Sequence, residues 1–509
     1  MNDYVVTVLD TTGIQPYIFG SNRLRENIGG SYLVDQATNK WAKDALRELA
    51  KRLGEPIQIY DPSRPADKPH VEDGELAAEL VYAGGGNTVL LFQSLDIAKQ
   101  FTRILSKRIL TDAPGINLVA AHQTFDWDNE SLHEVIGELM KNQLDRQKRE
   151  RIPSSPLLGL GVTAACQSTQ LVAVDMSDKH GCPMPYLVSR EIAAKLDAVK
   201  AANDKLDDTL FDAKIPKQYK IPLDFDDFGR SFGENSYLAI IHADGNNMGD
   251  RFQKYGKDRE NRDYITAMRK LSDSVRLAGL TALKTVANAV VDSIDSDNKV
   301  KGKFPIKDKY LPFRPLIYGG DDVTFVCDGR LGLELAEIYL SSFKGQKAAD
   351  DEKLSACAGI CVVKAHYPFA RAYELSEQLC KSAKKFARDQ KGENLSALDW
   401  HLAASGLFGS VGGIREREYQ VQQGDLTMRP VLLEKHSKTW RTWPNFTSII
   451  KAFNENPEWK ARRNKIIALR EKLREGIQAT QQFIQVYDLA ELPEVFKGNS
   501  KVQRVQKCG

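Results

Sequence analysis

Two adjacent carboxylates near residue 320 have the type and spacing of metal ligands. Residues 316–326, LIYGGDDVTFV, predict a β-hairpin whose turn carries Asp321 and Asp322. Gly319 and Gly320 let the backbone turn tightly and leave room for a ligand. Two neighbouring acids repel each other beside an apolar sheet unless a cation lies between them. Taken alone, these four residues are equally compatible with an ordinary acidic turn.

Asp244 supplies a third carboxylate after an apolar segment, residues 237–242, that predicts a strand. Two-metal phosphoryl transfer needs carboxylates from adjacent strands that hold cations roughly 3.5–4 Å apart. In a ferredoxin-like sheet this strand lies beside the acid hairpin, so the three acids can converge. We therefore predict a two-metal site for Mg²⁺ or Mn²⁺, in which one ion activates a 3′-hydroxyl and the other holds a triphosphate.

Four further residues are candidates for binding the nucleotide. The turn after the Asp244 strand contains Gly245 and Asn246, whose backbone amides can receive a phosphate. Lys384 and Lys385 lie on a predicted amphipathic helix, and one of them could reach the triphosphate. A solvated basic helix face is the alternative for these two lysines.

Two neighbouring residues are interpreted as structural. Asp250 suits the first turn of a helix, where an acid stabilises the positive end of the helix dipole. His242 is interpreted as a packed strand residue, because the eight histidines show no spacing of a second catalytic centre. No His-Asp dipeptide occurs, so a phosphohydrolase of that type has no visible motif.

The order of elements around the acid hairpin occurs twice. A strand, a helix, a hairpin, a helix and a strand are predicted over residues 4–125 and again over residues 237–363. The separation from the end of the first strand to the hairpin turn differs by one residue between the two copies. We therefore predict an α+β fold with two ferredoxin-like palm domains and a helical C-terminal domain.

The hairpin of the first copy lacks the acid pair. Gly86 and Asn87 stand where the second copy has Asp321 and Asp322. We therefore expect the first palm to be structural or to recognise a nucleotide, without binding metal. We also expect the two palms to pack face to face, with the nucleotide site at their junction.

The remaining segments complete the predicted organisation. The first palm, an inter-palm linker region, the second palm and a mostly helical C-terminal domain are assigned to residues 1–165, 166–235, 236–402 and 403–509. A helix capped by Ser31 is predicted from the apolar stripe Leu33, Ala37, Trp41, Ala45 and Leu49. The best helix of the C-terminal domain is predicted over residues 457–487.

The composition narrows the class of protein. The 509 residues carry a net charge of +3, so any nucleic-acid surface must be local. The seven cysteines lack paired C-x-x-C spacing, which predicts a reducing, cytoplasmic protein without a zinc site. No apolar segment reaches the length of a membrane span, so no membrane partner is expected.

Four segments resemble the large polymerase-cyclase subunit of type III CRISPR effector complexes. They are GIQPYIFGSNRLRENIGGSYLV, YAGGGNTVLLF, HADGNNMGD and IYGGDDVTF, at residues 13–34, 82–92, 242–250 and 317–325. The resemblance implies that the second palm condenses ATP into cyclic oligoadenylate messengers after target RNA binds the complex. It also implies metal ligation by Asp244, Asp321 and Asp322, with crRNA, target RNA and other effector subunits as partners.

The sequence departs from that family in two respects and leaves other functions open. A His-Asp nuclease domain and a four-cysteine zinc ribbon are common in the family, and neither is visible, so DNA cleavage and stoichiometric zinc are not expected. One alternative is an RNA-binding scaffold subunit with little synthesis of its own. Another is a template-dependent polymerase. A further alternative is a stand-alone cyclase that makes another cyclic nucleotide and could assemble as a homo-oligomer. The preference for ATP rests on the resemblance alone.

Overall fold

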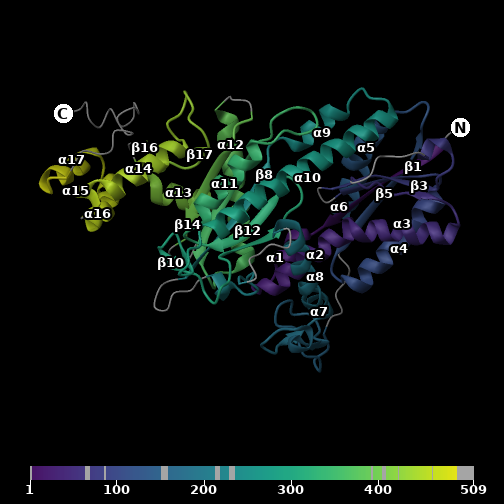
Figure 1. Cartoon of the computed structure of the whole chain (residues 1–509), viewed down its shortest axis with the longest axis horizontal. Helices are drawn as coiled ribbons and strands as arrows, with labels where there is room; N and C mark the ends of the chain where they lie inside the picture. Colours follow the sequence, from purple (N-terminus) through teal and green to yellow (C-terminus); the bar gives the residue numbers. More distant parts are fainter. Residues whose placement is uncertain are drawn as a thin grey trace.

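The structure is a computed structural model that describes residues 3–62, 69–84, 87–150, 159–211, 218–228, 236–390, 394–403, 409–421, 424–460 and 462–489. Two sheets follow one another along the longest dimension of the molecule, between the N-terminus at one end and the C-terminal helices at the other (Figure 1). None of the helices in the described residues combines the length and the apolar character needed to cross a membrane.

The first sheet has the order β2-β3-β4-β1-β5, in which β1 pairs antiparallel with both β4 and β5. Its elements are β1 (Asp3–Thr12), α1 (Ile14–Phe19), α2 (Leu24–Thr38), α3 (Lys40–Leu53), β2 (Ile57–Gln58), β3 (Ala78–Gly84), β4 (Asn87–Phe92), α4 (Leu95–Asp112) and β5 (Asn117–Asp126). Side chains alternate between the faces of a strand. Accordingly, Val6 and Val8 of β1 enter one apolar core, while Val5 and Leu9 enter another.

The second sheet has the order β11-β12-β8-β13-β14-β17. Its elements are β8 (Tyr237–Gly245), α9 (Met248–Gly256), α10 (Asn261–Asp292), β11 (Phe313–Ile317), β12 (Val323–Asp328), α11 (Gly332–Lys344), β13 (Ala356–Lys364), α12 (Phe369–Asp389), β14 (Ala397–Leu402) and β17 (Val431–Leu432). The strands β11-β12-β8-β13 repeat the arrangement β3-β4-β1-β5. The predicted α+β fold with two ferredoxin-like palms is therefore confirmed.

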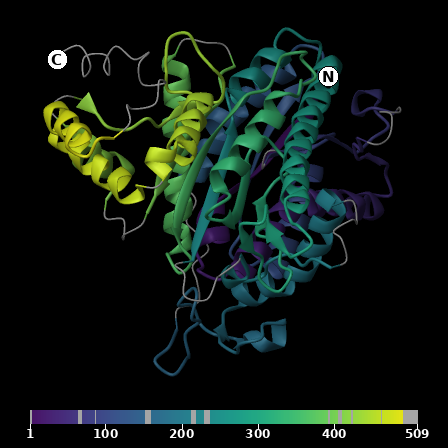
Figure 2. The ribbon, with the colours of Figure 1, turned by 60° about the vertical axis from the view of Figure 1, so that its left-hand side comes forward.

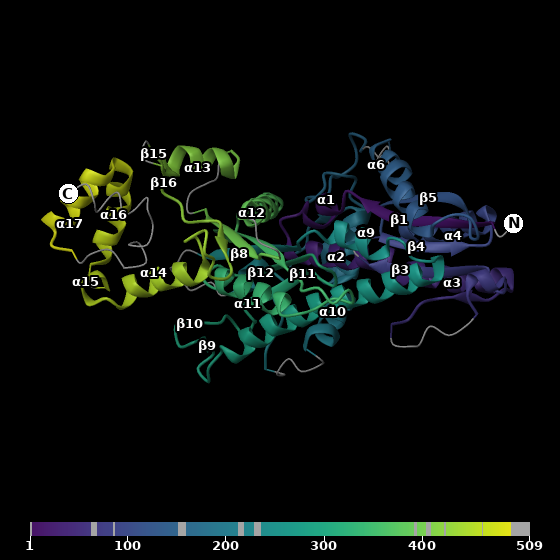
Figure 3. The same ribbon diagram turned by 90° about the horizontal axis from the view of Figure 1, so that it is seen from above.

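The two palms share their apolar cores. Ile241 of β8 lies in the same core as Val6 of β1, and Ile240 lies in the same core as Val5. Helix α10 extends from the second palm to the first and lies along β3 and α11 (Figure 3). The two sheets are therefore held as one packed body.

The helix predicted to begin at Ser31 was wrong in its boundaries. Ser31 lies inside α2, which begins at Leu24, and the chain bends at Asn39 before α3 begins. The apolar stripe extends toward the N-terminus through the buried Leu24 and Ile28, so the true start lies earlier than a capping serine suggested. The Ser31 hydroxyl instead donates to the carbonyl of Leu316 in the second palm.

The single helix predicted over residues 457–487 was also wrong. The structure has three helices there, α15 (Pro457–Lys460), α16 (Arg463–Glu475) and α17 (Ile477–Val486). Gly476 has φ of 109°, a conformation that breaks the helix between α16 and α17. These helices lie beside the second palm, as Figure 2 shows in yellow. The basic C-terminal residues beyond 489 lie outside the described residues.

The segment between the palms forms a small unit on α2. It contains β6 (Asp175–Met176), β7 (Leu187–Val188), α7 (Arg190–Asp197) and α8 (Val199–Leu206). The buried Glu26 of α2 accepts hydrogen bonds of 2.8 Å from both Tyr186 Oη and Ser168 Oγ. Cys166 and Cys182 are buried free thiols in this unit. A carboxylate inside α2 therefore anchors the unit to the first palm.

Candidate active site at the junction of the two palms

The strand register brings the three predicted acids to one edge of the second sheet. Strands β8 and β12 pair antiparallel with Ala243 opposite Val323, so the next position places Asp244 opposite Asp322. The backbone N–H of Gly245 donates to the carbonyl of Asp321 across the same edge, at 3.2 Å. The acids thus come from adjacent central strands, as the sequence predicted.

The environment of the hairpin acids favours a cation. Asp322 Oδ1 is buried without a hydrogen-bond partner and lies 3.3 Å from Nδ1 of His242. Burial, and then the charge of Asp244, raise the pKa of Asp321 and raise that of Asp322 well above its usual range. Burial lowers the pKa of His242, which disfavours a positive charge on this ring. An orphaned carboxylate oxygen among like charges is a site that a bound cation would satisfy.

A lysine currently neutralises Asp244. Lys384 Nζ of α12 lies 2.7 Å from Asp244 Oδ2 and donates to the carbonyl of Gly245 at 2.8 Å. Lys385, one position further along the helix, is exposed, so Lys384 is the lysine that lies at the acids. Among the described residues, no three histidine, cysteine or acidic side chains are already arranged to hold a metal ion. The oxygen donors nevertheless fit Mg²⁺ or Mn²⁺ in type.

The two amides suggested as phosphate donors are already engaged. The N–H of Gly245 is bonded to Asp321, and the N–H of Asn246 donates to Ser355 O at 2.9 Å. The Asn246 side chain donates to Ser355 Oγ at 3.1 Å and to Leu395 O at 3.0 Å. Both residues therefore fix the end of β8 and have no free amide to offer a phosphate.

Helix α10 packs directly against the acid turn through a residue that sequence reasoning missed. Gly319 has φ of 111°, which glycine adopts readily. A Cβ atom at Gly279 of α10 would lie 2.2 Å from the carbonyl oxygen of Gly320. A glycine inside a long helix costs about 1 kcal/mol relative to alanine, which was the available signal that this position serves packing.

Two cavities meet at the acid turn. A cavity of about 280 Å³ is bordered by α1, α2, α8 and β11, and one of about 1120 Å³ by α9, α10 and the first-palm hairpin. The residues that line both are Arg276, Gly319, Gly320 and Asp321. The larger cavity also reaches Asp10 and Asn87 of the first palm. The two hairpins therefore face a common space, which confirms the predicted face-to-face packing.

The first palm replaces a cation with its own side chains. Leu9 pairs with Thr88, so Asp10 lies opposite Asn87, as Asp244 lies opposite Asp322. With its nitrogen turned toward Asp10, the Asn87 amide lies 2.9 and 3.2 Å from the two carboxylate oxygens.

Lys148 completes this arrangement. It lies on α6 (Asp145–Glu150) and forms an ion pair with Asp10. Lys148 and Lys384 both belong to the helical segment that follows the last strand of the repeated arrangement, β5 in the first palm and β13 in the second. An amide and an ammonium group thus neutralise the Asp10 carboxylate in the first palm. The sequence had indicated only the loss of the hairpin acids.

The sequence of the second palm decides the family. Residues 237–392 match the family model of the Cas10/Cmr2 second palm domain. This segment is similar to the Cas10/Cmr2 palm domain. The match contains Asp244, the acid turn and Lys384, so the resemblance predicted from the motifs is confirmed for this domain. A search of curated proteins finds no relative of the sequence.

Solved structures share the fold of the whole chain. A chain of the Csm1–Csm4 cassette crystallised with pppApApA is 12% identical with a TM-score of 0.53, over 99% of this chain and 67% of that chain. The apo cassette is 13% identical with a TM-score of 0.51, over 99% and 70%. Csm1 of T. onnurineus is also similar, at 14% identity and a TM-score of 0.47, over 99% and 67%. The two cassette chains with TM-scores of 0.53 and 0.51 thus share the fold of this chain over both palms.

Proposed function

We propose that this protein is a metal-dependent nucleotidyltransferase that condenses ATP into cyclic oligoadenylates in antiviral, type III CRISPR-like defence. The observation that carries the proposal is the acid turn, in which Asp321 lines both inter-palm cavities, Asp322 lines the smaller one, and Asp244 lies on the adjacent strand. A cavity on each side of one acidic turn suits two nucleotides that react with each other. The bound pppApApA named for a cassette of the same fold supports adenylate as the substrate class.

The chain's own residues have separable roles in this proposal. When bound by the three acids, Mg²⁺ or Mn²⁺ would activate the 3′-hydroxyl and neutralise the triphosphate. Lys384 would turn from Asp244 to the phosphates once a metal ion takes its place. Gly319 and Gly320 leave room for the nucleotide beside the acids. Asp10 and Asn87 would orient the second nucleotide from the first palm, without a metal of their own.

The partners proposed are those of the structural relatives. The cassettes pair Csm1 with Csm4, so we propose a Csm4-like subunit as a partner, together with crRNA and target RNA as regulators. The test is to incubate purified protein with labelled ATP or GTP and Mg²⁺ or Mn²⁺, with and without RNA and the partner subunit. Cyclic products from ATP support the proposal. If the protein binds RNA but forms no product from either nucleotide, the result favours the scaffold alternative. Products from GTP would favour a cyclase that makes another cyclic nucleotide.

Replacing Asn87 with alanine should reduce turnover and spare metal binding by the second palm. With its nitrogen turned toward Asp10, the Asn87 amide donates to that carboxylate. Asn87 lines the large cavity, but it is remote from the three acids in sequence and belongs to the other sheet. We expect a loss of about tenfold in kcat/KM, since one hydrogen-bonding contact is worth about 1–2 kcal/mol. Titration with Mn²⁺ followed by electron paramagnetic resonance should give the wild-type affinity; a weakened affinity would contradict this division of roles.

Replacing Gly279 with alanine should displace the acid turn without unfolding α10. Alanine improves helix propensity by about 1 kcal/mol, but its methyl group would collide with the Gly320 carbonyl. Misplacement of catalytic groups by about 1 Å can cost about 10²-fold in rate. We therefore expect a fall of that order in turnover with unchanged helical circular dichroism. Gly412→Ala is the control, because this glycine lies inside another helix, α13 (Val411–Tyr419), and a Cβ there would meet only Ser410 Oγ, at 3.9 Å; equal losses in both variants would refute the packing argument.

A further inference from the structure

A polar stripe runs along α10 toward the junction of the palms. Arg262, Arg269, Asp273 and Arg276 are spaced so that they lie on one face of the helix. The first two reach into the first palm, and the last lines both cavities. Three members of the stripe, Arg262, Arg269 and Asp273, contact side chains of the first palm.

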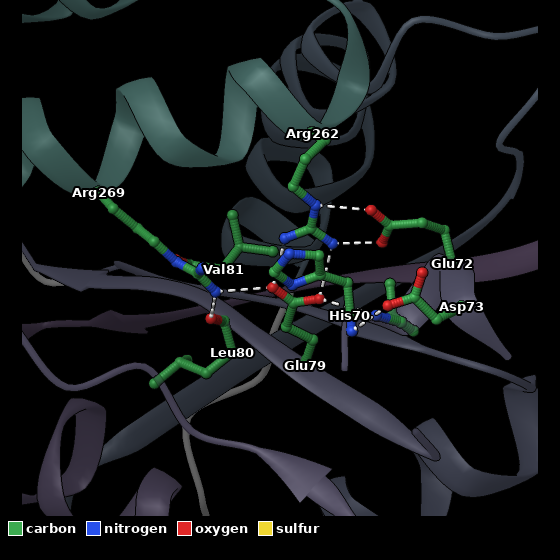
Figure 4. Close-up of polar contacts among 9 residues, drawn as sticks. His70, Glu72, Asp73, Glu79, Leu80, Val81, Arg262 and Arg269 are labelled. Carbon is green, nitrogen blue, oxygen red and sulfur yellow. Dashed lines mark hydrogen bonds and ion pairs between the residues drawn. The ribbon is translucent and has the colours of Figure 1, made fainter. Parts of the chain in front are cut away.

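The first end of the stripe is an ion-pair cluster buried between the palms (Figure 4). Arg262 Nη1 lies 2.7 Å from Glu79 Oε1, and Arg262 Nε lies 2.7 Å from Glu72 Oε1. Arg269 Nη2 lies 2.8 Å from Glu79 Oε1, and its Nε donates to Val81 O at 2.8 Å. Glu79 has no exposed surface, and two arginines balance two glutamates. Because buried charges are costly unless they remain paired, this cluster holds α10 in one position against β3.

The middle of the stripe ties Asp273 to the first palm. Tyr60 donates a hydrogen bond to Asp273, and the Arg269 guanidinium lies 4.6 Å from the centre of the Tyr60 ring. Arg276 Nε is 3.8 Å from Asp273 Oδ1, a distance longer than a hydrogen bond. Asp273 is therefore close enough to orient the Arg276 side chain, and it leaves the guanidinium N–H groups of Arg276 available to donate to a ligand.

Arg276 stands where an anion would be expected in the proposed reaction. Of the four residues that line both cavities, three belong to the acid turn and Arg276 is the basic one. The Arg276 side chain is 43% exposed to solvent, whereas the helix that carries it is held by the buried ion-pair cluster. A guanidinium offers a planar set of donors that matches phosphate oxygens.

We propose that Arg276 binds the phosphates of the reacting nucleotide at the junction of the two cavities and stabilises the departing pyrophosphate. This inference rests on the proposed function. In the reaction, a 3′-oxygen forms a bond to the α-phosphorus of the second nucleotide, and the bond from that phosphorus to the α–β bridging oxygen breaks. The bridging oxygen leaves with the electron pair as part of pyrophosphate, and the hydroxyl proton passes to water. The guanidinium donates hydrogen bonds to the charge that grows on the pyrophosphate.

The test compares Arg276→Ala, Arg276→Lys and Lys270→Ala. Lys270 is an exposed residue of the same helix, so its removal controls for the loss of a positive charge on α10. Turnover of ATP should fall about 10³-fold in Arg276→Ala, the lower range for an arginine that stabilises phosphoryl transfer. Arg276→Lys should recover part of this loss, because charge is restored without the planar donor set. Lys270→Ala should match the wild type.

A binding measurement separates this inference from the proposed function. The probe is an ATP analogue with a methylene group between the α- and β-phosphates, titrated calorimetrically with Mg²⁺, and melting curves check folding. We expect weaker binding of the analogue by Arg276→Ala at an unchanged melting temperature. If Arg276→Ala binds the analogue and turns over ATP as the wild type does, the inference is overturned. If the wild type binds the analogue through Arg276 but makes no product from ATP, the proposed function fails and the phosphate contact stands.

Discussion

Replacing Asp321 and Asp322 together with alanine should reduce nucleotide condensation by at least about 10³-fold and leave the protein folded. The two carboxylates are the hairpin's contribution to metal ligation, and metal ions supply several kcal/mol of charge stabilisation in phosphoryl transfer. Asp244→Ala should behave similarly, because the acids of one strand cannot replace the ligand of the other. Initial rates of pyrophosphate release measure the effect.

The same double variant should be more stable than the wild type in the absence of metal. The raised pKa of Asp322 means that ionising this group disfavours the folded state. That penalty is absent below the ordinary aspartate pKa and grows as the pH rises toward the folded pKa. Melting curves in a chelator should therefore show a larger gain in melting temperature at pH 7 than at pH 4.

Asp250→Ala is the matched control for the acid turn. Asp250 is an exposed acid in the first turn of α9, close in sequence to Asp244 but interpreted as a helix-stabilising residue. Its removal should change turnover less than about threefold, since an exposed dipole contact is worth less than 1 kcal/mol. Near-normal turnover in the Asp321→Ala/Asp322→Ala variant would mean that the active centre lies elsewhere.

Replacing Glu79 with alanine should weaken the contact between the two palms and lower the free energy of unfolding by about 3–5 kcal/mol. The change leaves Arg262 and Arg269 buried without their shared carboxylate, and breaking a buried pair costs that much. The expected result is a lower melting temperature together with lower turnover. Differential scanning calorimetry and proteolysis at the boundary between the palms measure it.

The pH dependence of Glu79 has the opposite sign to that of the acid turn. Burial acts to raise the pKa of Glu79, but the hydrogen bonds and charges of the two arginines outweigh it and hold the pKa below its ordinary value. Its contribution to stability is therefore present at neutral pH and is lost as the pH falls through the folded pKa. Glu72→Ala is the control: Arg262 then keeps Glu79, so the loss of stability should be clearly smaller than for Glu79→Ala.

Patterns local in sequence predicted most of the fold. Apolar strands, the acid turn and the repeated order of elements were visible because each depends on a short segment and its period. The boundary of α2 was missed because Ser31 has the type of a capping residue, whereas its hydroxyl bonds to Leu316 of the other palm. The break at Gly476 was missed because a single glycine inside a helical segment does not by itself end a helix.

The parts of the site that were missed depend on contacts between distant segments. Lys148 neutralises Asp10 although the two residues lie far apart in the sequence of the first palm. Gly279 contacts Gly320 from α10, a helix that precedes the hairpin. The spacing of Arg276 on α10 predicts only a helix face, and its relation to both cavities follows from how α10 packs between the palms. The sequence could not distinguish Lys384 from Lys385, because only the packing of α12 against the second sheet shows which of the two faces Asp244.

Mass spectrometry of the products formed from ATP tests the central claim most directly. Purified protein with Mn²⁺, in the presence of RNA and a Csm4-like subunit, should yield cyclic oligoadenylates and one pyrophosphate for each bond formed. The Asp321→Ala/Asp322→Ala variant, measured in parallel, should yield neither. Equal amounts of product from the wild type and this variant, or no adenylate product from a folded wild type under all these conditions, would contradict the account.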